Sequence, residues 1–370
     1  MSRGLQRVVA SGGPLARGRA YGRQAADKVR RCIAAYRDAF QHRAGLAWDE
    51  ALARARGFED DIAVFSPIAL LEMRGIAEGA GADFDAILAL NCRSELMFAA
   101  AQRGAVPSEC TSFAVAPEAS ADGHMLLGQN WDWVPFAREV CVLVEMRRDD
   151  GPDFATVVEA GMLAKVGFNS AGLGLCTNTL VSSKDAARHG VPYHVMLRSL
   201  LDAESVAGAE RILTSVERAL SANYLVADKF GAAANFETIA GGAGAVRTTR
   251  PTRGLLAHSN HFLDPEFAPI DAYVGNSPHS LTRLDAMRRG LAGSGLSVAR
   301  LKEILRDHEH APNGVCSHPD PKAHPLYART TVASVVADLT AGEMWVTEGP
   351  PCGAEYQNYS LPRTAAVSTP

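Results

Sequence analysis

The chain has 370 residues, a formal net charge of −4, 47% hydrophobic residues and 21% charged residues. This composition is typical of a globular protein, and a chain of this length buries a large core without disulfides or metals. Lysine and arginine are scattered along the sequence, which argues against a nucleic-acid partner. The 7 cysteines are widely spaced and form no Cys-x-x-Cys pair, which argues against a disulfide scaffold and a zinc ribbon.

The sequence shows no targeting or membrane segment. Its first residues, MSRGLQRVVASGGPLARGRA, contain no apolar stretch of the signal-peptide kind. The longest apolar runs are far shorter than the roughly 18 residues of a transmembrane helix. We therefore expect a cytoplasmic protein without a membrane partner. Higher oligomers are compatible with the sequence, which does not specify the number of copies.

Residues 14–109 are expected to form helices. Pro14 stands at a helix-start position, and a stripe at helical spacing should face a core; it comprises Val29, Cys32, Ile33, Tyr36 and Phe40. A second helical region begins with Ser66 as N-cap and Pro67 in the first turn. The segment EGAGADF at 78–84 interrupts it.

From Cys110 onward, short strand-like runs predominate. The first are CTSFAVA, MLLGQNWDW, VCVLVEMR, FATVVEAG and LAKVGFNSAGLGLCTNTL. Helical stretches follow near 191–201 and 204–219. Strands resume with ANYLVAD, ANFETIAG, GAVRTTRP and RGLLAHSNHF, helices with 278–291 and 297–308, and the last strands are TTVASVVADL and GEMWVTEG. This order predicts an α+β fold in which helices cover antiparallel sheets.

Cys110 lies in PSECTSF, where the helical pattern gives way to the strand pattern. As an N-terminal residue it would carry an α-amine of pKa about 7.7–8.0 beside a thiol of pKa about 8.5, so the amine could act as its base. That state requires cleavage of the Glu109–Cys110 bond, in which the sulfur attacks the Glu109 carbonyl and water cleaves the thioester. A buried structural cysteine is the alternative interpretation.

An ordered set of motifs places the chain near a known family. ECTSFAV, GQNWDW, GFNSAGLGLCTNTL, HSNHF and RTTVASVVADLTAGEMWVTEGPPC together resemble the acyl-coenzyme A:6-aminopenicillanic acid acyltransferase (isopenicillin N acyltransferase) family. These are self-processing N-terminal-nucleophile (Ntn) hydrolases. The segment RGIAEGAGADFDAILALNCRSEL resembles the propeptide of that family, and the resemblance spans roughly residues 14–355.

The resemblance implies a fold and a division of the chain. The expected fold is an αββα sandwich of two antiparallel sheets flanked by helices. Residues 1–109 would form a helical propeptide that stays bound as a small chain, and residues 110–370 the catalytic large chain. No cofactor and no metal is implied.

The resemblance also assigns roles to residues. Cys110 matches the nucleophile, and Asp132 matches the aspartate that orients the nucleophile and its amine. Asn260 matches the oxyanion donor. Asn178 lies near a second oxyanion or substrate-binding group, and Arg329 corresponds to a late arginine that steadies the amine and the aspartate.

One position departs from the family pattern. Members of the family have glycine before the cysteine, whereas this chain has Glu109. Glycine tolerates the strained backbone that self-cleavage exploits. We therefore expect Glu109 to slow processing.

The predicted function is that of a self-processing amide hydrolase or acyltransferase. It would act through an S-acyl enzyme on a small N-acyl amine, N-acyl amino acid or acyl thioester. One alternative is an unprocessed, non-catalytic ligand-binding protein of the same fold, which Glu109 would favour. Another is a metal-dependent hydrolase built on residues 307–324, a segment that contains His308, His310, Cys316, His318, Asp320 and His324.

Overall fold

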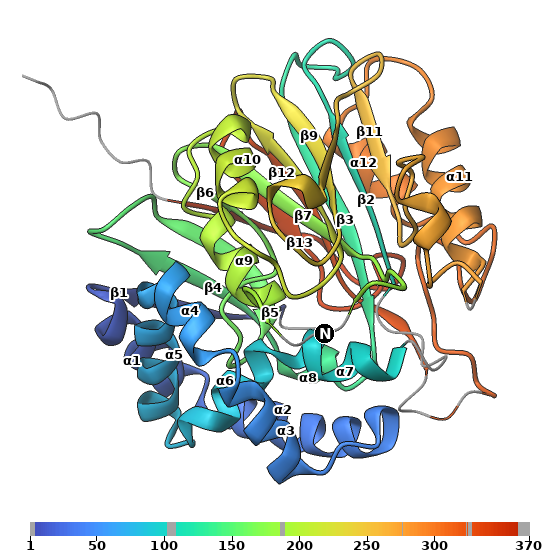
Figure 1. The fold of residues 1–370 in the computed structure, drawn as a ribbon. Helices are drawn as coiled ribbons and strands as arrows, with labels where there is room; N and C mark the ends of the chain where they lie inside the picture. Colours follow the sequence, from blue (N-terminus) through green and yellow to red (C-terminus); the bar gives the residue numbers. More distant parts are fainter. Residues whose placement is uncertain are drawn as a thin grey trace, which may run out of the picture.

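The computed structural model describes residues 4–101, 109–185, 189–275, 277–322, 324 and 328–361, and only the backbone at 98–101 and 109. Two sheets lie face to face, and helices cover both outer faces (Figure 1). One sheet has the strand order β1-β4-β5-β6-β7-β8-β9-β10, and the other has the order β11-β2-β3-β12-β13-β14. Among the described helices, none has both the length and the apolar character that crossing a bilayer requires.

The strands are short and, in the middle of each sheet, buried on both faces. The eight-stranded sheet contains β1 (Gln6–Ser11), β4 (Cys141–Arg147), β5 (Phe154–Glu159), β6 (Val166–Asn169), β7 (Leu173–Thr179), β8 (Ala222–Asp228), β9 (Ala233–Thr238) and β10 (Val246–Thr249). The six-stranded sheet contains β11 (Leu255–His258), β2 (Glu109–Val115), β3 (Leu126–Trp133), β12 (Thr330–Asp338), β13 (Glu343–Val346) and β14 (Gln357–Ser360).

Two helix pairs form the outer layers of the sandwich. Helices α9 (Tyr193–Leu200) and α10 (Val206–Thr214) cover the eight-stranded sheet, and α11 (His279–Leu291) and α12 (Val298–Ile304) cover the six-stranded one (Figure 1). The N-terminal helices lie together below the sheets in this view. They are α1 (Pro14–Gln24), α2 (Ala26–Ala39), α3 (Trp48–Arg56), α4 (Glu59–Phe65), α5 (Pro67–Ala80), α6 (Phe84–Asn91) and α7 (Arg93–Ala101); the short α8 (Ala137–Val140) follows β3.

Helix α5 begins and ends as its sequence indicates. Ser66 Oγ accepts a hydrogen bond from the Ala69 amide at 3.4 Å, and Pro67 occupies the first helical position. Gly81 ends the helix with φ of 63°. A Cβ on Gly75 would lie 2.4 Å from the Leu15 carbonyl oxygen, so glycine lets α1 approach α5 closely.

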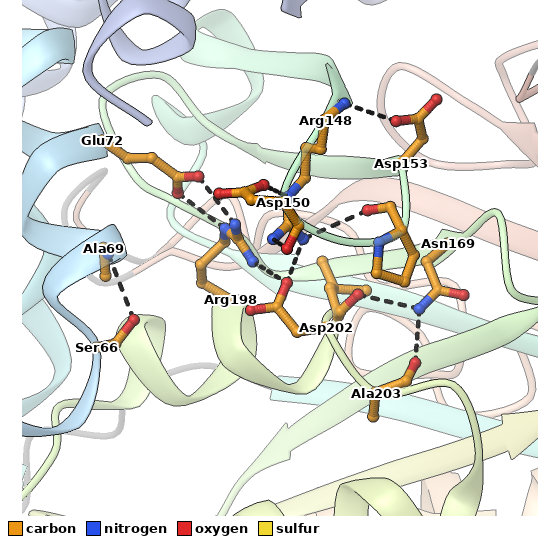
Figure 2. A network of polar contacts seen from close by, with 12 residues as sticks. Ser66, Ala69, Glu72, Arg148, Asp150, Asp153, Asn169, Arg198, Asp202 and Ala203 are labelled. Carbon is orange, nitrogen blue, oxygen red and sulfur yellow. Dashed lines mark hydrogen bonds and ion pairs between the residues drawn. The ribbon is translucent and has the colours of Figure 1, made fainter. Parts of the chain in front are cut away.

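A ring of alternating charges joins these N-terminal helices to the rest of the chain, and Figure 2 shows its members from Glu72 to Asp150. Its members, in order, are Arg17, Glu72, Arg198, Asp202, Arg148 and Asp150. Glu72 of α5 is fully buried; it accepts from Arg17 Nε at 2.6 Å and from Arg198 Nε at 2.8 Å. Because each charge lies between two of opposite sign, the ring offsets the desolvation cost of burying them.

The predicted αββα layering is confirmed, and each strand and helix expected after Cys110 is present. The predicted N-terminal stripe is buried at Val29, Cys32, Tyr36 and Phe40 but only half-buried at Ile33. Two strands were not predicted. β1 lies in the segment expected to be helical and pairs parallel with β4, so the larger sheet is not wholly antiparallel. β14 pairs with β13 and forms one edge of the smaller sheet.

Candidate active site

Cys110 lies at the start of an interior strand. It is the second residue of β2, which pairs with β11 on one side and β3 on the other. Its side chain is fully buried and lies near Lys165, Cys176 and Tyr193, which are in or directly beside the eight-stranded sheet and its helix layer. The thiol therefore faces the interior between the two sheets.

Three buried side chains hold the main chain of Cys110. Its nitrogen donates to Asn260 Oδ1 at 2.6 Å. Its carbonyl oxygen accepts from Arg283 Nη1 at 2.7 Å and from Asn178 Nδ2 at 3.2 Å. These residues come from three different parts of the chain, so the fold gathers them around the two peptide units that flank the Cys110 α-carbon.

Asn260 reaches Cys110 because β11 pairs with β2. His258 lies opposite Ser112, so the residues that follow β11 continue toward the start of β2. The Asn260 amide donates its own Nδ2 to the Thr179 carbonyl at 2.9 Å. In this intact chain Asn260 therefore acts as an acceptor for the Cys110 nitrogen, and its amide hydrogens point to Thr179.

Asp132 lies directly opposite Glu109 in the pairing of β2 with β3. Its carboxylate is fully buried and accepts from Thr331 Oγ1 at 2.6 Å. Trp131 is the residue opposite Cys110, and neighbouring residues of a strand point to opposite faces. Asp132 is thus next to the predicted cleavage point but projects to the face away from the Cys110 thiol.

The processing site is described only in part. The backbone of Glu109 forms the first residue of β2. Its side chain and residues 102–108 lie outside the described residues. The Glu109–Cys110 bond is consequently placed at the beginning of β2, opposite Asp132 and Trp131.

Arg329 and Arg283 occupy different surroundings. Arg329 Nη2 donates to Asn313 Oδ1 at 2.9 Å. The guanidinium that contacts both Cys110 and Asn260 is that of Arg283, whose Nη2 lies 3.0 Å from Asn260 Oδ1. The sequence analysis missed Arg283. The available signal was its place on the buried face of α11, which also carries Ser280, Leu284, Met287 and Leu291.

Lys165 is a second residue that the sequence analysis missed. It directly precedes β6 and is buried, with Nζ 4.9 Å from the Trp131 ring centroid and 5.4 Å from that of Tyr193. Burial lowers the pKa of Lys165 to about 8, although the nearby Cys110 raises it. An amine of this pKa can exchange protons near neutral pH. The signal in the sequence was a lysine inside the apolar run LAKVGF.

The histidine- and cysteine-rich segment forms a separate group. His308, Cys316 and His318 converge with Cys352, and their ligand atoms all lie within 4.8 Å of one another. His310, Asp320 and His324 do not belong to this group in the part of the chain that the structure describes.

Comparison with known proteins gives one close family match. A family model described as acyl-coenzyme A:6-aminopenicillanic acid acyl-transferase matches residues 119–351. The 40 kDa form of acyl-coenzyme A:6-aminopenicillanic-acid-acyltransferase from Emericella nidulans is 27% identical over 248 residues. That alignment covers 66% of this chain and 66% of the relative, slightly less than two thirds of its length.

Two solved structures match this chain at low similarity. A conjugated bile acid hydrolase from Clostridium perfringens is 13% identical with a TM-score of 0.42, covering 70% of this chain and 99% of that one. A penicillin V acylase from Agrobacterium tumefaciens is 13% identical with a TM-score of 0.40, covering 69% and 80%.

The family match includes most of the polar side chains around Cys110. Asp132, Asn178, Asn260 and Arg283 all fall within residues 119–351, and Cys110 itself precedes that range. The match covers more than half of the chain. This protein therefore belongs to the acyl-coenzyme A:6-aminopenicillanic acid acyl-transferase family.

Proposed function

We propose that this protein cleaves its own chain before Cys110 and then acts as an amide hydrolase or acyltransferase through an S-acyl enzyme. The observation that carries the proposal is the arrangement of Asn260, Asn178 and Arg283 around the main chain of one buried cysteine. Membership of an acyltransferase family supports acyl chemistry. The substrate class is a small N-acyl amine, an N-acyl amino acid or an acyl thioester.

The first step is an acyl shift within the chain. The Cys110 sulfur attacks the carbonyl carbon of Glu109, and the bond from that carbon to the Cys110 nitrogen breaks. Lys165 accepts the thiol proton and returns it to the departing nitrogen, a task that suits its pKa of about 8. Water then hydrolyses the thioester, leaving a Glu109 carboxylate, a free Cys110 thiol and a free α-amine.

Asn260 holds the nitrogen that this step releases. Its Oδ1 already accepts from the Cys110 N–H at 2.6 Å, so the new amine would stay beside the thiol. Once free, the amine can serve as general base for the same cysteine. We assign Asp132 to orienting this amine, since it lies opposite the cleaved bond, and the amide of Asn260 to the oxyanion of the acyl-transfer step.

The intact chain keeps its nucleophile covered. The Cys110 side chain is fully buried, so a substrate has no direct access to the thiol before processing. The two segments should stay together afterwards because the charge ring, with Arg17 and Glu72 on one side and Arg198 and Asp150 on the other, spans them. This supports residues 1–109 as a small chain that remains bound to residues 110–370.

Intact mass under denaturing conditions tests the proposal. Wild-type protein should give two fragments of roughly 11–12 and 27–28 kDa by proportion of chain length, the larger beginning at Cys110. Cys110→Ala should give one chain of 39.3 kDa. Cys176→Ala, a buried cysteine of β7 close to Cys110, is the matched control and should still be processed.

The same experiment separates the alternatives. A wild-type protein that stays intact at 39.3 kDa would contradict self-cleavage and favour the unprocessed ligand-binding protein. If processing occurs, candidate acyl donors should add the mass of their acyl group to the larger fragment. Trapping by added amines then distinguishes a transferase from a hydrolase.

A further inference from the structure

The loops beside the outer face of the six-stranded sheet bring together two histidines and two cysteines. His308 follows α12, Cys316 and His318 lie on the loop that leads to β12, and Cys352 follows β13. The sequence separates Cys352 from the other three, and only the fold places all four within 4.8 Å of one another. The mechanism proposed for Cys110 uses none of them.

We propose that His308, Cys316, His318 and Cys352 form a Cys2His2 site for a structural zinc ion. The donor set is the one that selects zinc over hard cations such as magnesium and calcium. Four protein ligands fill a tetrahedral site, so no position stays open for substrate or water. The geometry thus points to a structural role and away from a metal-dependent hydrolase at this segment.

The distances fit a tetrahedron of zinc ligands. His318 Nε2 lies 3.6 Å from Cys316 Sγ, 3.4 Å from Cys352 Sγ and 3.0 Å from His308 Nε2. Zinc–sulfur bonds of about 2.3 Å and zinc–nitrogen bonds of about 2.0–2.1 Å give tetrahedral edges of about 3.3–3.8 Å. The two imidazoles therefore need to separate by only a few tenths of an ångström to admit the ion.

Main-chain contacts hold the segments that carry the ligands. The Cys316 nitrogen donates to the Asp307 carbonyl at 2.9 Å, and the His318 nitrogen donates to the Pro312 carbonyl at 2.8 Å. Arg306 Nε donates to the Pro351 carbonyl at 2.9 Å, which fixes the residue before Cys352. The site is therefore supported from three segments before any metal enters.

The site connects to Asp132 through two residues. Ser317, which follows Cys316, donates its nitrogen to Thr331 Oγ1 at 2.9 Å and accepts from the Thr331 nitrogen at 3.0 Å. Thr331 Oγ1 donates to the Asp132 carboxylate at 2.6 Å. Zinc would thus hold the loop that positions Thr331 against Asp132. This role does not depend on whether the chain cleaves itself.

Metal content of the full, untagged chain is the direct test. Protein purified under reducing conditions and dialysed against metal-free buffer should retain about one zinc per chain by elemental analysis. Cys352→Ser and His308→Ala should lower the retained zinc at least tenfold, an expectation of about the size seen when metal sites are disturbed. His310→Ala, two residues from His308 and outside the cluster, should retain zinc like the wild type.

Cobalt provides a readout that does not require a variant. Apoprotein titrated with Co²⁺ should develop the strong ligand-field bands of tetrahedral cobalt and a thiolate-to-cobalt charge-transfer band. Absence of these bands, or zinc content equal in wild type and Cys352→Ser, would overturn the proposal. A Cys316–Cys352 disulfide in freshly purified protein, seen as a two-hydrogen mass deficit, would overturn it as well.

Discussion

Asn260 Oδ1 accepts a hydrogen bond from the Cys110 main-chain nitrogen at 2.6 Å, and the same oxygen accepts from Arg283 at 3.0 Å. One amide oxygen thus links the predicted cleavage point to a buried cation. If the Glu109–Cys110 bond breaks, this oxygen keeps the new amine next to its own thiol. Asn260 is therefore the first residue to substitute in a test of the mechanism.

Asn260→Ala should slow self-cleavage by about 10²-fold or more, because the departing nitrogen loses the side chain that accepts its hydrogen bond. The fraction of intact chain against time, measured by mass spectrometry, gives the rate. Asn313→Ala, which removes the partner of Arg329, is the control. Equal rates for Asn260→Ala and wild type would remove Asn260 from the mechanism.

The two arginines can be compared directly. Arg283→Lys should lower processing and turnover by about 10²-fold, because one ammonium nitrogen does not reproduce the fork by which Nη1 contacts Cys110 and Nη2 contacts Asn260. Arg329→Lys should stay within a few-fold of wild type, since Arg329 donates to Asn313 and a lysine can donate to the same oxygen. The reverse result would restore Arg329 as the arginine that steadies the amine.

Self-cleavage should follow the protonation of Lys165. Only the neutral amine accepts a proton, so the rate should rise with pH and level off above about pH 8, the pKa that burial gives Lys165. Lys165→Met should be processed at least about 10²-fold more slowly and should lose this rise. Precursor purified at low pH and then transferred to a series of buffers supplies the profile. A wild-type profile that survives in Lys165→Met would exclude this residue as the base.

The charge ring should matter far more than a surface ion pair. Arg17→Met leaves the buried Glu72 without one of its partners and should cost about 3–5 kcal/mol in the free energy of unfolding. Arg19→Met, in the same helix, breaks an exposed pair with Glu78 and should cost at most about 1 kcal/mol. Denaturant titration of both variants measures the contrast. Similar losses would mean that the ring contributes nothing beyond packing.

Glu95 should give the unfolding free energy a distinct pH dependence. Burial raises the pKa of Glu95 to about 7, although the Tyr193 amide, which donates to it at 2.8 Å, lowers it. The pKa of Glu95 is therefore higher in the folded chain than in the unfolded chain. Its contribution to the free energy of unfolding is fully present below about pH 4.5 and is lost as the pH rises to about 7.

Glu95→Gln mimics the protonated acid, so the difference in unfolding free energy between variant and wild type should grow with pH. The expected growth is about 3 kcal/mol between pH 4.5 and pH 7, for a shift from 4.5 to about 7. Denaturant titrations at several pH values provide the comparison. A difference that stays constant with pH would show that folding does not shift the pKa of Glu95.

Much of the fold could be predicted because its signals are local. Ser66 and Pro67 mark the start of a helix. After Cys110, turn residues separate short strand-like runs and so mark where each strand ends. β1 escaped prediction because six residues, QRVVAS, carry little periodicity, and its partner β4 lies far along the chain. Short strands of this kind form only when a tertiary neighbour supplies the other half of the ladder.

Residues of the candidate site could be predicted from the sequence where a family motif contains them, and not elsewhere. Asn178 and Asn260 were predicted from the resemblance of LCTNTL and HSNHF to family motifs, and the structure places both beside Cys110. Arg283 lies in an ordinary helix and Lys165 directly before a strand, and the roles proposed for them rest on burial beside a partner that is distant in the chain. Cys352 likewise joins its cluster only through the return of the chain after β13.

The parallel pairing of β1 with β4 has a consequence for the fate of the two fragments. β1 covers the hydrogen-bonding edge of β4, a strand that is almost wholly buried. Loss of the N-terminal fragment would expose that edge to the equivalent edge of another molecule, which is a route to aggregation. If the chain is processed as proposed, residues 1–109 should therefore stay in place as a permanent subunit. A cell that made residues 110–370 alone would be expected to accumulate insoluble protein.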